Sequence, residues 1–325
     1  MKFRSIISLL AASVVLTSCS SIPHTSSSPQ GEEGYPVDVT SCGKTLHFDR
    51  RPQKVIMMSL VDATIMDRLG LLDQIDYRVG DNRLPSDYAD LAKRIDAIPT
   101  LDASTNDTGG VVLSNESILN AEADLIIGYS PSVSDQSALE EAGVQIYTTE
   151  AYCPDFSADH ADWSFVDQEV DKIAAIFGVR ERGEKLKEEI HRTIDSISVP
   201  DRHTSAAALY VTPGSSTFYA YGSSSMVQPI FETNGLTNAY ADNSTRVFDA
   251  SMEDLLKRDP KWIVILSDPS SAQEALESFS SMPGADGLQA VRNHRMIHLD
   301  FPYTDPPSDL SVEGARQLST AMEKA

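Results

Sequence analysis

The stretch Ser-Asn-Glu-Ser-Ile-Leu-Asn-Ala-Glu-Ala-Asp-Leu-Ile-Ile, residues 114–127, decides the fold because its pattern occurs twice in the chain. The second copy, residues 251–264, reads Ser-Met-Glu-Asp-Leu-Leu-Lys-Arg-Asp-Pro-Lys-Trp-Ile-Val. Each copy predicts a serine-capped helix start, a short helix, an acidic turn and a buried strand. The repeat therefore predicts two similar α/β lobes. Each lobe presents a glutamate at the same place, Glu116 or Glu253, and two such charges can form a docking surface.

The bulk composition indicates a folded and strongly acidic chain. Its 325 residues are enough for two ordinary domains, and 41% of them are hydrophobic. Acidic residues outnumber basic ones by 48 to 26, which gives a formal net charge of −22. A field of this sign repels nucleic acid and anionic lipid headgroups, so nucleic-acid binding is excluded. Most of the charge is interpreted as a solvated acidic surface.

The N-terminus predicts export. A short basic start is followed by the apolar stretch Ser5–Leu16, which is too short to span a bilayer. The following Leu-Thr-Ser-Cys resembles a bacterial lipobox, which implies cleavage before Cys19 and lipidation of its thiol. Residues 1–18 are then a lipoprotein signal peptide, and residues 19–34 a disordered polar tether. We expect a lipid-anchored protein on the extracytoplasmic face of the cell membrane; an ordinary signal peptide with an incidental cysteine is the alternative.

Two cysteines remain in the mature chain, Cys42 and Cys153. Outside the cytosol an even pair favours a disulfide, and the spacing of these two matches no zinc motif. We expect a Cys42–Cys153 bridge that ties an N-terminal hairpin to the end of the first lobe. Two free buried thiols are the alternative.

The pattern along the chain predicts an α/β fold of two Rossmann-like lobes with mostly parallel sheets, joined by a single long connecting helix. Strand-like and helical runs alternate in an N-terminal lobe, residues 35–161, and again in a C-terminal lobe, residues 200–325. Between them, residues 162–199 contain only helical periodicity, with the connecting helix over residues 180–198. An ordinary surface helix of one domain is the alternative for that last element.

Sequence motifs for catalysis are missing. The chain contains no phosphate-binding loop, no Gly-x-Gly-x-x-Gly after a strand and no Gly-x-Ser-x-Gly. Its seven histidines form no zinc-binding grouping. The sequence therefore predicts a binding protein that is not an enzyme and has no intrinsic cofactor or metal ligand.

A set of short stretches in a fixed order resembles the bacterial ABC-importer substrate-binding proteins for ferric siderophores, haem and cobalamin. The matching stretches are residues 35–48, 51–56, 69–75, 114–128, 176–179, 251–266 and 290–293. The resemblance implies two lobes joined by one long helix, a monomer, and ABC permease subunits as partners. It also implies that Glu116 and Glu253 pair with arginines of the permease. The alternative for both glutamates is support of a helix start, where a negative charge is favourable.

Ligands of open α/β sheets bind beyond the carboxyl ends of the strands, which places the site in the cleft between the lobes. Arginines there could pair with the carboxylates or catecholates of an iron chelate, and aromatic walls suit a large ligand. A surface position for each arginine and a core position for each aromatic residue are the alternatives. The predicted ligand-binding residues are Met58, Arg83, Tyr129, Tyr219, Tyr221, Arg246 and Tyr303.

The expected ligand is a ferric siderophore, a small-molecule iron chelate that brings its own oxygen ligands. Haem or cobalamin is the alternative within the same transporter class, although no histidine, tyrosine or methionine has a spacing that marks it as an axial haem ligand. Two other classes stay open at this point: a cell-surface lipoprotein without a transport role, and an enzyme that reduces or hydrolyses the chelate.

Overall fold

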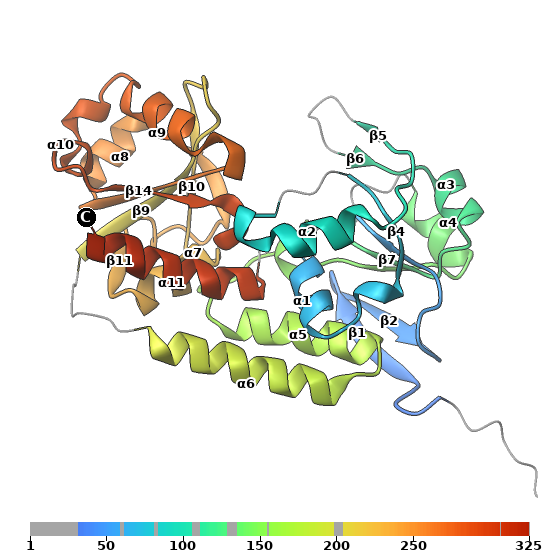
Figure 1. Cartoon of the computed structure of the whole chain (residues 1–325). Coiled ribbons are helices and arrows are strands. Elements are labelled where there is room, and N and C mark those ends of the chain that lie inside the picture. The colour runs from blue at the N-terminus through green and yellow to red at the C-terminus, as the bar shows by residue number, and fades with distance from the viewer. Residues whose placement is uncertain are drawn as a thin grey trace, which may run out of the picture.

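The structure is a computed structural model that describes residues 32–58, 62–80, 84–105, 111–128, 135–154, 156–197, 204–305 and 307–324. It shows two α/β lobes side by side above a pair of helices (Figure 1). This arrangement confirms the predicted fold class. The predicted lipidation site Cys19 and the predicted ligand-binding residues Arg83 and Tyr129 lie outside the described residues.

The first lobe contains a parallel sheet with the strand order β4-β3-β7-β8. The two central strands, β3 and β7, are short, apolar and fully buried, as is typical of parallel strands covered on both faces. A hairpin precedes the sheet in the sequence, and a separate small two-stranded ribbon belongs to the same lobe. The strands are β1 (Val37–Ser41) and β2 (Lys44–Phe48) in the hairpin, β3 (Val55–Met57), β4 (Ile75–Arg78), β7 (Leu125–Ile127) and β8 (Gln145–Tyr147) in the sheet, and β5 (Ser104–Thr105) and β6 (Val111–Val112) in the ribbon. The helices are α1 (Ala63–Arg68), η2 (Leu72–Gln74), η3 (Ser86–Tyr88), α2 (Ala89–Asp96), α3 (Asn115–Asn120), α4 (Gln136–Glu141) and η5 (Glu150–Tyr152).

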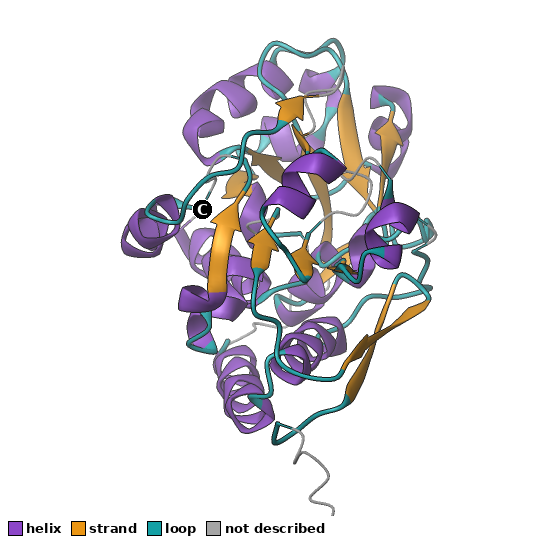
Figure 2. Ribbon diagram, turned by 90° about the vertical axis from the view of Figure 1, so that its right-hand side faces the viewer, coloured by secondary structure: helices purple, strands orange, loops and turns teal. Residues whose placement is uncertain are grey.

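Two helices follow the first sheet, α5 (Ser164–Ile176) and α6 (Arg180–Ser196). Helix α5 buries an apolar face in the core of the first lobe, and α6 continues beneath both lobes toward the second sheet (Figure 1). The two helices pack closely at Gly183, where a Cβ atom would lie 2.8 Å from the Cβ of Ala174. Figure 2 shows the hairpin β1–β2 beside this helix pair. The helix pair therefore forms a shared base for both lobes.

The second lobe has a mixed sheet with the order β12-β10-β9-β13-β14, and β11 also pairs with β9. The pairs β9–β10 and β10–β12 are antiparallel. For β9–β10 the reason is that the connection 211–217 is too short for the crossover that a parallel pair needs. The strands are β9 (Thr204–Tyr210), β10 (Phe218–Tyr221), β11 (Leu236–Asn238), β12 (Val247–Ala250), β13 (Trp262–Ser267) and β14 (Met296–Asp300). The helices are α7 (Val227–Thr233), α8 (Met252–Arg258), η6 (Pro269–Ser271), α9 (Ala272–Ser280), η7 (Ala285–Gly287), α10 (Gln289–Arg292), η8 (Phe301–Tyr303) and α11 (Asp309–Lys324).

A polar junction joins the lobes at the base. The buried carboxylate of Asp309, at the start of α11, accepts a hydrogen bond from the Thr64 hydroxyl on α1. Arg68, also on α1, lies 3.5 Å from the same carboxylate and 2.7 Å from Glu189 on α6. One carboxylate therefore connects the first helix of the first lobe to the last helix of the second.

Candidate functional site

The repeated stretches fold into equivalent helix starts. In α3 the Ser114 hydroxyl accepts a hydrogen bond from the Ser117 amide at 3.1 Å, and in α8 the Ser251 hydroxyl accepts one from the Asp254 amide at 3.1 Å. Such caps satisfy amides that a helix leaves without a backbone partner. Each glutamate of the repeat is therefore the second residue of a capped helix.

The helix ends are also equivalent. Glu122 after α3 and Asp259 after α8, which align in the repeat, are both left-handed, with φ of 54° and 36°. Ile118 and Leu255, one turn earlier, are both fully buried. The buried side chain fixes the rotation of each helix, so Glu116 and Glu253, each two residues earlier, occupy equivalent positions on their helices.

Glu116 and Glu253 are both exposed. Among the residues that the structure describes, Glu253 pairs only with Lys257 on its own helix, at 2.9 Å, and the side chains of both are largely exposed. Helices α3 and α8 lie on different lobes and both on the side of the molecule away from α6 (Figure 1). Beside Glu116, the Leu119 side chain is 48% exposed. This side of the molecule thus offers one capped, carboxylate-bearing helix from each lobe.

A pocket of about 340 Å³ lies between the lobes. Its first wall is the segment after β8, with Tyr152, Cys153, Phe156 and Ser157, and its second wall is residues 244–247, the end of the loop before β12 and the first residue of that strand. Because β8 is parallel to its neighbours, this wall lies at the carboxyl edge of the first sheet, where α/β proteins bind ligands.

Arg246 connects the two walls. Its guanidinium forms an ion pair with the fully buried Asp305 and lies 5.1 Å from the centroid of the Tyr152 ring, on the other lobe. The neighbouring carboxylate raises the pKa of Arg246, so the side chain stays charged. Arg246 is thus already paired, and it presents little uncompensated positive charge to a ligand.

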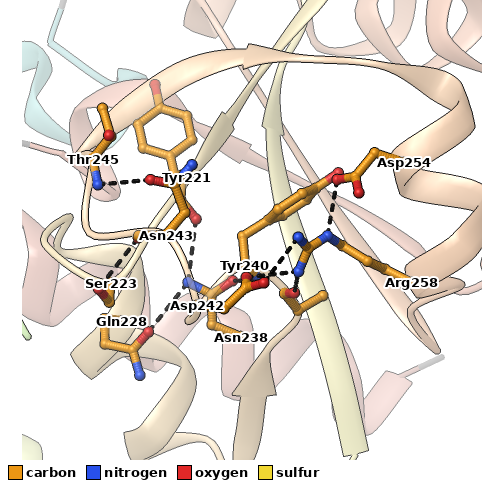
Figure 3. Close-up of polar contacts among 11 residues, drawn as sticks. Tyr221, Ser223, Gln228, Asn238, Tyr240, Asp242, Asn243, Thr245, Asp254 and Arg258 are labelled. Atoms are coloured by element: carbon orange, nitrogen blue, oxygen red, sulfur yellow. Dashed lines mark hydrogen bonds and ion pairs between the residues drawn. The ribbon is translucent and has the colours of Figure 1, made fainter.

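The second wall is held by a network of polar contacts around Arg258 on α8 (Figure 3). Arg258 donates to both carboxylate oxygens of Asp242, at 2.7 and 3.1 Å, and to the Ala239 carbonyl at 2.6 Å. The same loop passes so close to Gly222 that a Cβ atom there would clash with the backbone of residues 243 and 245. The loop that carries Arg246 is therefore held in place by contacts with α8, the helix that also carries Glu253.

The first wall is held by the hairpin tip. The Ser41 hydroxyl donates to the Thr148 carbonyl at 2.9 Å and accepts from the Thr148 amide at 2.8 Å. Cys42 forms a disulfide with Cys153, so the predicted cysteine pair is bridged in the structure. The hairpin thus holds both ends of the segment 148–153, through hydrogen bonds at Thr148 and the disulfide at Cys153.

The lobes also meet through two aromatic side chains. Tyr303 in η8 has its ring centroid 6.4 Å from that of Tyr88 in η3, and its hydroxyl donates to Asp87 at 3.4 Å. Burial raises the pKa of Tyr303, which keeps the phenol neutral. This contact and the Tyr152–Arg246 contact join the lobes at two separate places.

The described members of the predicted ligand-binding set differ in exposure. Tyr219 is 45% exposed and Met58 is partly exposed, whereas Tyr221 and Tyr303 are 3% and 2% exposed. Tyr219 and Tyr221 share a face of β10 by strand alternation, but Tyr221 lies in the apolar core of the second lobe. Tyr221 and Tyr303 are therefore packing groups in this structure, and of the three aromatic residues of the set that the structure describes, Tyr219 offers surface.

Sequence reasoning missed Tyr152, Asp305 and the loop residues 242–245, because no local pattern marks them. The sequence feature that came closest to indicating Tyr152 was its neighbour Cys153, which was predicted to form a disulfide. Within the part of the chain that the structure describes, no group of three or more His, Cys, Asp or Glu side chains could hold a metal ion. None of the described helices is both long and apolar enough to cross a membrane.

Comparison with known proteins gives consistent matches. The pattern of the family described as periplasmic binding protein matches residues 55–303. A structure of an ABC-type Fe3+-hydroxamate transport system from Saccharomonospora viridis has 30% identity and a TM-score of 0.80, covering 89% of this chain and 99% of that one. A periplasmic haem-binding protein of Vibrio cholerae has 17% identity and a TM-score of 0.63, covering 83% and 98%. A vitamin B12-binding protein of the same organism has 15% identity and a TM-score of 0.57, covering 84% and 97%; these two likenesses concern the fold alone. No curated protein matches the chain.

Proposed function

Because the chain belongs to the periplasmic binding protein family, we propose that it captures a ferric siderophore outside the cytoplasm and delivers it to an ABC permease. The observation that carries this proposal is the 30% identity, over 89% of the chain, to a structure from an Fe3+-hydroxamate transport system. The lipobox at Cys19 supports delivery from a lipid anchor at the membrane surface. The permease subunits are the protein partners, and the binding protein acts as a monomer.

Charge favours a hydroxamate chelate over a catecholate chelate. Three hydroxamates neutralise Fe3+, whereas three catecholates leave a strongly anionic complex. The chain has a formal net charge of −22, and Arg246 in the pocket is already paired with Asp305. A neutral or cationic ligand avoids the repulsion that a trianion meets near such a surface.

Binding by the purified full chain to a panel of chelates tests this proposal. We expect saturable quenching of tyrosine and tryptophan fluorescence by a ferric trihydroxamate, with a Kd at least about tenfold below that of a ferric tricatecholate. Haemin and cobalamin are included as ligands of the alternative functions. Preferred binding of either would replace the siderophore proposal, a chemically altered chelate would indicate an enzyme, and no binding at all would favour a surface lipoprotein without a transport role.

We also propose that Glu116 and Glu253 dock the protein on its permease. Replacing both by Ala is expected to reduce uptake of the ferric chelate by about tenfold or more, because desolvated interface ion pairs couple by about 1.5–7 kcal/mol. Ligand affinity in solution is expected to stay the same, because both side chains are exposed and outside the pocket. Uptake of the labelled chelate by cells and titration of the purified variant measure the two effects separately.

Glu181 provides a matched control. It is also exposed and also the second residue of a helix, but it lies on α6, on the other side of the molecule. Glu181→Ala is expected to leave uptake unchanged. If this control reduces uptake as strongly as the Glu116→Ala and Glu253→Ala changes, the docking assignment is wrong.

A further inference from the structure

The segment Thr148–Cys153 lies between the hairpin tip and the pocket. Its backbone is tightly turned: the Tyr152 amide donates to the Thr149 carbonyl at 2.8 Å, and the Cys153 amide donates to the Glu150 carbonyl at 3.0 Å. Tyr152 and Cys153 both line the pocket between the lobes. A displacement of this segment would therefore change the shape of the first wall.

The segment has three sets of contacts. The hairpin tip supplies the two Ser41–Thr148 hydrogen bonds and the Cys42–Cys153 disulfide. Helix α5 supplies Glu169, which accepts from the Glu150 amide at 3.1 Å, and Lys172, which lies 2.9 Å from the Glu150 carboxylate. Asp62, before α1, accepts a hydrogen bond from the Thr149 hydroxyl at 3.1 Å. Removing the hairpin contacts would leave Tyr152 and Cys153 without the covalent link that fixes their end of the segment.

We propose that the hairpin tip is a positioning element for the ligand pocket, and that Tyr152 is the wall residue whose position it sets. The inference deepens the proposed function, because it takes the pocket to hold part of the ferric chelate. Tyr152 contacts the chelate directly, whereas Ser41, Cys42 and Cys153 act through it.

The position of Tyr152 matters because the residue meets Arg246 across the lobe boundary. The Arg246 guanidinium lies 5.1 Å from its ring centroid, within the range of a cation–π contact. A displaced ring would lose this contact and would leave the second wall supported by Asp305 alone on that side. A pocket built from both lobes thus depends on a hairpin at the start of the first lobe.

Titration calorimetry of the full chain with a ferric trihydroxamate separates positioning from folding. Tyr152→Ala is expected to raise the Kd about tenfold, as truncation of a buried interface tyrosine does. Ser41→Ala and the double change Cys42→Ser with Cys153→Ser are expected to raise the Kd about three- to tenfold, with an unchanged number of sites per molecule. A purely structural role would lower the number of active sites and leave the Kd of the folded molecules unchanged, which would overturn the inference.

Coupling between the variants gives a second criterion. If the hairpin acts through Tyr152, Ser41→Ala is expected to have little further effect on the Kd once Tyr152 is Ala. If the two changes instead raised the Kd by independent factors that multiply in the double variant, the inference would be contradicted. Tyr35→Phe is the matched control: it removes the 2.6 Å hydrogen bond from the Tyr35 hydroxyl to the Ile176 carbonyl, at the root of the hairpin and away from the segment 148–153. An equal loss of affinity in Tyr35→Phe would show a general effect of hairpin stability.

Amide hydrogen exchange tests the positioning step without any ligand. Faster exchange at Tyr152 and Cys153 is expected in Ser41→Ala and in the double cysteine variant, and not in Tyr35→Phe. Unchanged exchange in the first two variants would overturn the inference even if the chelate binds. Failure of every chelate to bind, together with the expected exchange pattern, would instead refute the proposed function and leave the positioning role of the hairpin intact.

Discussion

Replacing Cys42 and Cys153 together by Ser is expected to lower the free energy of unfolding by about 3–5 kcal/mol. The bridge joins residues 111 positions apart, so its loss releases a long loop in the unfolded chain and raises the entropy of that state. Urea unfolding followed by circular dichroism measures the change as a lower midpoint.

Reduction of the unchanged protein is the matched experiment. It breaks the same bond without a substitution, so the reduced protein and the double variant are expected to unfold at the same midpoint. A decrease of less than about 1 kcal/mol in the free energy of unfolding of both samples would contradict the prediction, because the closure of so long a loop predicts a larger decrease.

Asp62→Asn is expected to stabilise the protein at neutral and alkaline pH. The Asp62 carboxyl is fully buried before α1, and burial followed by repulsion from Glu169 raises its pKa to about 7. The folded state therefore holds this proton more tightly than the unfolded state, in which the pKa is near 4. Stability from this group is complete below about pH 4 and declines as the pH rises to about 7.

The variant removes this pH-dependent loss while keeping a group that can accept the 3.1 Å hydrogen bond from the Thr149 hydroxyl. At pH 8 it is expected to gain on the order of 3–4 kcal/mol over the unchanged protein, and at pH 4 to gain nothing. Urea unfolding at pH 4, 6 and 8 measures this difference. Asp102→Asn, at an exposed position, is the control. If the stability gained by Asp62→Asn did not vary with pH, the gain would not come from the raised pKa of Asp62.

The repeated stretch predicted the equivalent helices α3 and α8 because the interactions that form them are local. Ser114 and Ser251 cap amides three residues away, and Ile118 and Leu255 are buried by helical periodicity. The N-terminal hairpin was predicted for the same reason, and its strands β1 and β2 pair in register on either side of a turn at residues 42 and 43. Local chemistry was enough in each case.

Apart from Arg246, the residues of the pocket walls could not be predicted, because their contacts join distant residues. Arg246 pairs with a carboxylate 59 positions away, and Tyr152 meets it from the other lobe. The order of the second sheet was not predicted either, since strand β12 is a short, partly exposed edge strand without a marked alternation. Such pairs depend on how the two lobes are placed, which neither a repeat nor a periodicity specifies.

The junction of Asp309 with Thr64 and Arg68 bears on how long a captured molecule would stay bound. Moving the lobes apart would separate a buried carboxylate from both of its partners in the first lobe, and water would have to replace the two contacts. The junction therefore opposes separation of the lobes, and the residence time of a captured molecule would depend on the work that a second protein does to separate them.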